Sequence, residues 1–118
     1  MKLEDAIAAH TEWKFKLRQF VDNTGEAKLQ SAIVASDSAC ALGRWMHGDG
    51  KKLETVPEFR EARAAHAEFH RCAGEVVRAV ETNDRTHASS LLAASGAFER
   101  SSQLIGTCLV RLRKAIRG

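Results

Sequence analysis

The spacing of apolar residues is the feature that most restricts the fold of this chain. Residues of one face recur every three or four positions over long stretches, as in amphipathic helices. In the last third of the chain this face consists of Leu91, Ala94, Phe98, Ser102, Ile105, Leu109, Leu112 and Ile116. No stretch shows the apolar–polar alternation of a strand. The sequence therefore predicts an all-α fold, a four-helix bundle with an additional short helix.

Capping and helix-breaking residues set the expected helix boundaries. Gly25 separates the first helix from a weaker one, and Asp37 marks the start of the short helix. Pro57, the single proline, suits the first turn of a long helix, and Asn83 lies in the turn that ends it. Glycine and charged residues at 48–52 predict a loop. We expect helices over residues 3–24, 27–35, 38–46, 57–81 and from about 85 to the end.

Length and composition exclude several classes of protein. The 118 residues correspond to one domain, spanning 1–118. No apolar run approaches the ~18 residues of a membrane span, and the N-terminus has the pattern of an amphipathic helix rather than of a signal peptide. The net charge of +3 is small and interspersed, so neither nucleic acid nor membrane is an expected partner. Three cysteines without framework spacing indicate a reducing, cytoplasmic compartment.

Three histidines occupy helix faces that would otherwise be apolar. His66 and His70 lie four residues apart on the long predicted helix, so their side chains point the same way. His10 lies in a similar stripe near the N-terminus, and Cys40 belongs to the short helix. The helices that carry them can be neighbours in an antiparallel bundle. Three imidazoles and one thiolate form a full ligand set for tetrahedral zinc, so we expect one zinc ion per chain.

The residues around this set have more than one interpretation. In one interpretation Asp37 caps the short helix. Cys40 would then lie in its first turn, where the helix dipole favours a thiolate. Asp37 can also put a negative charge beside the metal, and the two roles are compatible. Trp13 and Trp45 are expected to pack in the core and to shield the metal from water. The residues expected to lie outside the site are His47, Cys72, His87 and Cys108.

At these residues the chain resembles the chemoreceptor zinc-binding (CZB) domain family. The matching pieces are His10-Thr-Glu-Trp13-Lys14, Asp37-Ser-Ala-Cys40-Ala-Leu42-Gly43-Arg44-Trp45-Met46, Gly48-Asp49-Gly50-Lys51, Pro57-Glu-Phe59, His66-Ala-Glu-Phe69-His70, Ala94-Ser95-Gly96-Ala97-Phe98 and Ser102. The cysteine piece with its preceding aspartate is the most specific. The resemblance implies that His10, Cys40, His66 and His70 are the zinc ligands and that Asp37 is the family's aspartate near the cysteine.

The resemblance also implies a function that the residues alone do not. Domains of this family are bacterial, cytoplasmic and regulatory, and they form homodimers. They are attached to chemotaxis receptors, or to diguanylate cyclases that make cyclic di-GMP. Their associated inputs are zinc and the oxidation of the zinc-bound cysteine by hypochlorous acid. For this chain the resemblance implies a redox-responsive site at Cys40 and Asp37, and a partner signalling domain of one of these two kinds.

Four functions remain as alternatives. The leading one is a zinc-binding regulatory or sensory domain without enzymatic activity. A second is a structural zinc site that stabilises a dimerisation module. A zinc hydrolase is disfavoured because four protein ligands leave no open position for water, and no general base lies at the spacing of an HExxH motif. A metal-free bundle would require four coincidences at core positions.

Overall fold

The computed structural model describes residues 3–22, 29–38, 40–93 and 95–117, and these ranges contain helices and turns but no strand. The elements in chain order are α1 (Leu3–Asp22), α2 (Ser31–Val34), α3 (Ala41–His47), the 3₁₀ helix η1 (Asp49–Leu53), α4 (Pro57–Glu81), α5 (Arg85–Leu92) and α6 (Ala97–Arg117). The predicted all-α bundle, with an additional short helix at the cysteine, is confirmed.

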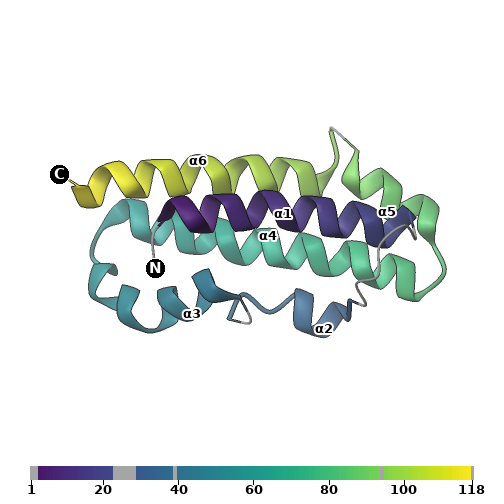
Figure 1. The fold of residues 1–118 in the computed structure, drawn as a ribbon, viewed down its shortest axis with the longest axis horizontal. Coiled ribbons are helices and arrows are strands. Elements are labelled where there is room, and N and C mark those ends of the chain that lie inside the picture. The colour runs from purple at the N-terminus through teal and green to yellow at the C-terminus, as the bar shows by residue number, and fades with distance from the viewer. Residues whose placement is uncertain (1–2, 23–28, 39, 94, 118) are drawn as a thin grey trace.

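Three long helices, α1, α4 and α6, run lengthwise through the molecule (Figure 1), and α4 is central in its contacts with the other helices. Helices α1, α2, α5 and α6 all pack against α4. The segment that carries α2 and α3 runs along α4, and α5 lies at the end of the bundle away from α3 (Figure 1). Because α1, α3 and α4 carry the predicted metal ligands or adjoin them, this arrangement decides whether those ligands meet.

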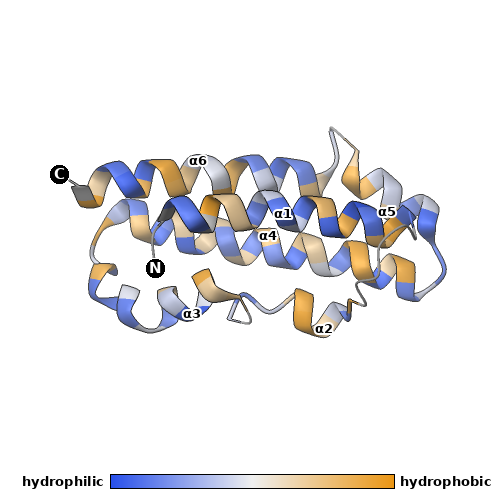
Figure 2. Cartoon of the chain, viewed as in Figure 1, coloured by the Kyte–Doolittle hydropathy of each residue, from blue (hydrophilic) through white to orange (hydrophobic). Residues whose placement is uncertain are grey.

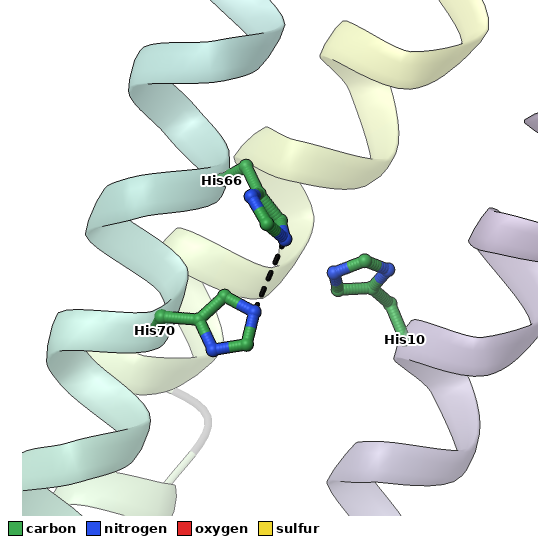
Figure 3. A group of neighbouring side chains, drawn as sticks. All are labelled: His10, His66 and His70. Atoms are coloured by element: carbon green, nitrogen blue, oxygen red, sulfur yellow. Dashed lines mark hydrogen bonds between the residues drawn. The ribbon is translucent and has the colours of Figure 1, made fainter. Parts of the chain in front are cut away.

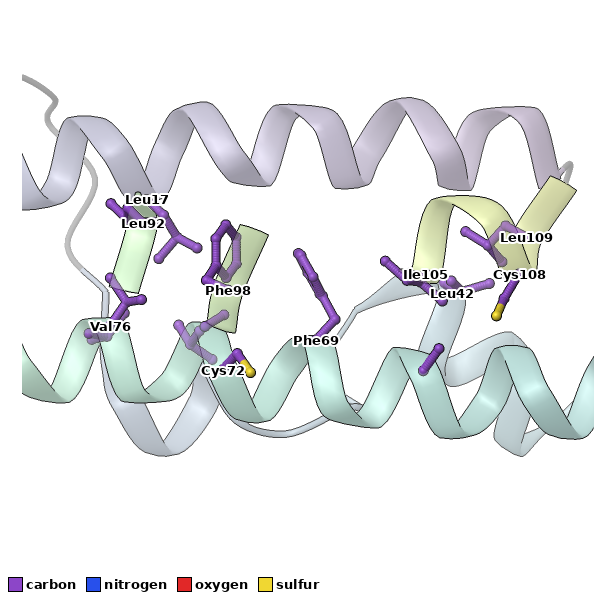
Figure 4. Close-up of a cluster of buried hydrophobic side chains, with 14 of the residues drawn as sticks. Leu17, Leu42, Phe69, Cys72, Val76, Leu92, Phe98, Ile105, Cys108 and Leu109 are labelled. Atoms are coloured by element: carbon purple, nitrogen blue, oxygen red, sulfur yellow. The ribbon is translucent and has the colours of Figure 1, made fainter. Parts of the chain in front are cut away.

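The core lies between the long helices. Figure 4 shows side chains from α1, α4 and α6 meeting in the space between the helices, with Leu42 of α3 joining them. Leu17, Phe69 and Phe98 are at most 1% exposed. Each such side chain stabilises the fold by roughly 1.5–3 kcal/mol relative to its exposed state. Both hydrophobic and hydrophilic residues occur along each long helix (Figure 2). No helix among the described residues is long and apolar enough to span a membrane.

The long central helix begins and ends where the sequence predicts. Val56 has the extended backbone (φ −83°, ψ 120°) that a residue before proline favours, and Pro57 then occupies the first turn of α4. Asn83, with φ 62°, lies in the left-handed region and reverses the chain after α4. The carboxylate of Asp84 then accepts the backbone N–H of His87 at 3.1 Å, which caps α5.

The single helix predicted after residue 85 is wrong, because the chain is broken between α5 and α6. Gly96 lies at this break, where a Cβ would approach the carbonyl oxygen of Leu91 to 2.4 Å, so the close return of the chain requires a glycine. The predicted buried face also ends early, since Ile116 is 42% exposed near the end of α6. Ala94, another residue of that face, lies outside the described residues.

Other predicted boundaries shift by a few residues. The first helix is described from Leu3 to Asp22, and the predicted end at residue 24 lies outside the described residues. Of the described residues in the range predicted as 27–35, α2 covers Ser31–Val34. Residues 23–28 lie outside the description. The stretch 48–52, predicted as a loop, contributes most of the 3₁₀ helix η1, because its backbone N–H groups find acceptors three residues back, as in Lys51 to Gly48 at 3.0 Å.

Candidate metal centre

His66 and His70 form the rigid half of the site. Both lie on α4 one turn apart, and both are buried, at 0% and 3% exposure. Their Nε2 atoms are 3.1 Å apart. The i,i+4 spacing produces this proximity because such residues lie on the same face of a helix. A 25-residue helix therefore holds two nitrogen donors beside each other in the core.

His10 approaches from α1, on the opposite side of this pair. Its ring centroid lies 5.4 Å from that of His66 and 6.4 Å from that of His70. Figure 3 shows the three imidazoles converging, with His10 facing the two rings of α4. One ligand atom from each histidine lies within 4.8 Å of the other two, which is close enough for all three to hold one ion.

Cys40 approaches the same point from the start of α3. Its Sγ lies 3.2 Å from Nε2 of His66 and 3.4 Å from Nε2 of His70. Cys40 is also the N-cap of α3, and its Sγ accepts the backbone N–H of Gly43 at 3.3 Å. The structure therefore brings all four predicted ligand residues together, from α1, α4 and the start of α3.

The distances between the donor atoms match those of a tetrahedral zinc site. With Zn–N bonds of about 2.05 Å and a Zn–S bond of about 2.3 Å, tetrahedral geometry separates two nitrogens by about 3.3 Å, and sulfur from nitrogen by about 3.6 Å. The three distances among Cys40, His66 and His70 are 3.1, 3.2 and 3.4 Å. Cys40, His66 and His70 therefore fit zinc in both donor type and spacing, and a ligand atom of His10 lies within 4.8 Å of the two α4 histidines.

A backbone carbonyl fixes the tautomer of one ligand. Nδ1–H of His70 donates to the carbonyl oxygen of Val34, at the end of α2, over 2.8 Å. With the proton on Nδ1, the neutral ring presents the lone pair of Nε2 to the cluster, as a metal requires. Among the described residues, the buried Nδ1 of His66 has no hydrogen-bond partner. The orientation of His66 therefore depends on packing and on the contacts of its Nε2, whereas His70 is also held through Nδ1 by α2.

The electrostatics of the cluster favour a neutral imidazole and an acidic thiol. Burial lowers the pKa of His66 to about 3, helped by the charges of His70 and His10. Burial also lowers the pKa of His70, but its hydrogen bonds with Cys40 and Val34 outweigh this effect and raise it above the ordinary value. Burial raises the pKa of the Cys40 thiol, yet the hydrogen bonds from His70 and Gly43 make the net change a decrease.

Comparison with protein families agrees with this geometry. The model of the chemoreceptor zinc-binding domain, CZB, matches residues 10–77, more than half of the chain. The chain belongs to the CZB family. The matched range contains His10, Cys40, His66 and His70, whereas the resembling pieces from Ala94 to Ser102 lie outside it. Comparisons with curated proteins and with solved structures find no match.

Asp37 does not cap α3 in this CZB domain. The helix begins at Ala41, and Cys40 is its N-cap, with an extended backbone of φ −102° and ψ 165°. The carboxylate of Asp37 instead contacts Nε2 of His47 at 3.3 Å. The predicted cap is wrong because the Cys40 sulfur takes the backbone N–H that a capping carboxylate would take. The predicted charge of Asp37 beside the metal stays a prediction, and its charge contributes to the raised pKa of His70.

Sequence reasoning gave no structural role to Gly43 or to His47, which contact the chain before Cys40. A Cβ on Gly43 would lie 1.6 Å from the carbonyl oxygen of Asp37, so only glycine lets the chain before Cys40 lie against α3. The glycine within a short helix was the available signal for Gly43, since glycine there needs a packing reason. No local pattern pairs His47 with Asp37, because their contact depends on that close approach.

The remaining residues that the sequence analysis singled out lie in the core or pack against it. Trp13 and Trp45 are half-buried and pack against the core, with the Trp45 ring 6.1 Å from that of Phe59. Whether they shield a metal from water stays a prediction. Cys72 and Cys108 are buried. Burial is the leading cause of the raised pKa of each thiol.

Proposed function

We propose that this CZB domain binds one zinc ion per chain through His10, Cys40, His66 and His70. The observation that carries the proposal is the triangle formed by the Cys40 sulfur and the two Nε2 atoms of α4, with sides of 3.1, 3.2 and 3.4 Å. Bringing two such nitrogens and a thiol together in a core is unfavourable unless a cation joins them. Four protein donors leave no position for a reactive water, which supports a regulatory role without catalysis.

We further propose that Cys40 is the responsive ligand. It is only partly buried, whereas the three histidines are at most 7% exposed. An oxidant from solvent therefore meets the sulfur first. Hypochlorous acid would oxidise the thiolate to the sulfenic acid, as Cys–S⁻ and HOCl give Cys–SOH and Cl⁻. The sulfur loses two electrons and the chlorine gains them. Asp37 is the carboxylate nearest in sequence to this sulfur and is the proposed modulator of its charge.

Loss of the Cys40 donor would change how the domain packs. The other three donors lie on α1 and α4, so release of Cys40 would loosen the start of α3, while the long helices stay together and Leu42 and Met46 keep α3 on the core. We propose that this change passes, through a homodimer of cytoplasmic domains, to a chemoreceptor signalling domain or a diguanylate cyclase. Residues 1–118 would form one regulatory unit that controls chemotaxis or cyclic di-GMP synthesis in response to zinc or oxidant.

The first test measures the zinc content and thiol state of the purified domain before and after one equivalent of hypochlorous acid. We expect one zinc per chain, oxidation at Cys40 and zinc release without aggregation. Cys40→Ser should bind zinc more weakly and lose the response, whereas Cys72→Ser, a matched buried cysteine, should keep both. A domain that contains no zinc after growth in zinc, or a Cys40→Ser variant that responds normally, would refute the proposal.

A structural zinc site in a dimerisation module is the second candidate. The near-complete burial of the three histidines favours it, because buried ligands exchange slowly. A structural site holds zinc against a strong chelator until the fold is lost. A regulatory site releases zinc on mild oxidation while far-ultraviolet circular dichroism shows that the helices persist. Measuring zinc and helix content together separates the two functions.

A further inference from the structure

The four donors are not held equally firmly. His10 lies on a 20-residue helix, and His66 and His70 lie on one of 25 residues. Cys40 precedes a helix of only seven residues. The segment from Asp37 to His47, here named the cysteine arm, is therefore the least rigid support in the site. The contacts that hold this arm in place determine how readily the Cys40 sulfur moves away from the histidines.

One fastening lies in the middle of the arm. The N–H of Gly43 donates to the sulfur of Cys40 at 3.3 Å. The missing side chain of Gly43 also admits the carbonyl oxygen of Asp37, which would lie 1.6 Å from a Cβ. The chain before Cys40 thus folds back onto α3, and this contact directs the carboxylate of Asp37 toward the far end of the helix.

A second fastening joins the two ends of the arm. Nε2 of His47, the last residue of α3, lies 3.3 Å from Oδ2 of Asp37, and the two side chains are 45% and 29% exposed. Both charges act on the cluster as well, since Asp37 raises the pKa of His70 and His47 lowers that of His66.

We propose that His47 is a positioning residue of the metal centre, which acts through Asp37 to hold the cysteine arm closed on the three histidines. This inference rests on the proposed zinc binding. Leu42 and Met46 of α3 are buried in the core, at 2% and 1% exposure, so α3 is the anchored part of the arm. The contact between Asp37 and His47 joins the chain before Cys40 to this anchored helix, and it keeps the Cys40 sulfur beside the α4 nitrogens. Breaking that contact should speed zinc release more than it alters the fold.

The expected effect on the rate of zinc release follows from the solvent exposure of Asp37 and His47. Partly exposed ion pairs contribute at most about 1 kcal/mol, which corresponds to about a fivefold change in a rate. We therefore expect His47→Ala and Asp37→Asn each to speed zinc release by roughly two- to fivefold, with fivefold as the upper limit. The double variant should be no faster than the faster single variant, because both substitutions remove one interaction. His47→Gln, which keeps a donor at this position, should restore most of the wild-type rate.

The test follows zinc transfer from the loaded domain to a chromogenic chelator by stopped-flow absorbance. His87→Ala is the matched control, since His87 is also exposed but lies on α5 at the other end of the bundle (Figure 1). Zinc stoichiometry is measured first for every variant. A wild-type domain without zinc refutes the proposed function itself.

With zinc bound at one per chain, unchanged release in His47→Ala and Asp37→Asn refutes the role of His47. Multiplicative effects in the double variant, or no rescue by His47→Gln, also refute it, because His47 would then act independently of Asp37. Equal acceleration by His87→Ala would show a general effect of removing a surface histidine, and that too overturns the inference. Acceleration confined to the His47 and Asp37 variants supports it.

Discussion

Gly43 offers the sharpest test of the metal centre, because one methyl group should displace one ligand. In Gly43→Ala the new Cβ would lie 1.6 Å from the carbonyl oxygen of Asp37, whereas ordinary contacts begin at 3.4 Å. The chain before Cys40 must therefore retreat by about 1.8 Å. Metal–ligand distances tolerate only about 0.2 Å of change, so the sulfur can no longer complete the tetrahedron.

We expect Gly43→Ala to weaken zinc binding by about 100-fold, the upper end of the range for residues that orient ligands. The three histidines should still bind zinc, because the atoms nearest to the new methyl group belong to Asp37 and Ser38 rather than to α1 or α4. Overpacking should also lower the free energy of unfolding of the metal-free domain by about 1–3 kcal/mol. The measurement is a competition titration of zinc against a chelator of known affinity, together with urea unfolding.

Gly106→Ala is the matched control for this experiment. A Cβ at Gly106 meets no atom within 4 Å, so the same substitution adds a methyl group without a clash. It should leave zinc affinity unchanged and stabilise α6 by roughly 0.5–1 kcal/mol, since alanine favours helix over glycine. Zinc affinity in Gly43→Ala within threefold of the wild type would refute the reasoning, because the sulfur would then not depend on the packing of Asp37 against α3.

Three further results should follow from the site. Removing zinc with a chelator should lower the free energy of unfolding. Compared with the domain in the presence of free zinc at 100 times its Kd, the loss should be about 2.7 kcal/mol, which thermal unfolding can measure. Zinc affinity should fall at least about tenfold per pH unit below pH 6.5. The reason is that the raised pKa of His70 keeps a proton on this ring, which zinc must displace. A zinc affinity that does not change between pH 6.5 and pH 5.5 would contradict this prediction. In the metal-free folded domain the pKa of His66 is lowered to about 3. As pH falls below 6.5, His66 is therefore protonated in the unfolded chain but not in the folded domain, which favours unfolding. Between pH 7 and pH 5 the wild type should therefore lose about 2 kcal/mol more stability than His66→Leu, as measured by urea unfolding, and equal losses would show that His66 is not buried as a neutral ring.

Local patterns predicted the parts of the site that local geometry determines. His66 and His70 share a face of α4 because they are four residues apart, whatever the rest of the chain does. The ends of α4 followed from Pro57 and from the turn at Asn83. The convergence of His10 and Cys40 with this pair depends on helix packing, which periodicity allows but does not specify. The residue types on the helix faces predicted this ligand set, and the family resemblance supported it.

The parts that sequence reasoning missed depend on tertiary contacts. The break between α5 and α6 is hidden because Leu91 and Phe98 keep the three-and-four spacing across a point where the chain reverses. The cap of α3 was assigned to Asp37 because a carboxylate is the stronger acceptor, yet the backbone places the sulfur of Cys40 there instead. The contact of Asp37 with His47 then follows from a missing side chain at Gly43, and no pattern of side chains along the chain displays it.

The hydrogen bond from His70 to the carbonyl of Val34 connects the metal centre to backbone that supplies no ligand. A cation bound at Nε2 withdraws electrons through the ring and makes the Nδ1 proton more acidic, which strengthens its bond to an acceptor. Helix α2 should therefore lie more firmly on α4 when zinc is present. Amide hydrogen exchange in residues 31–35 would then slow on metal loading, so that α2 reports the occupancy of a site to which it contributes no ligand.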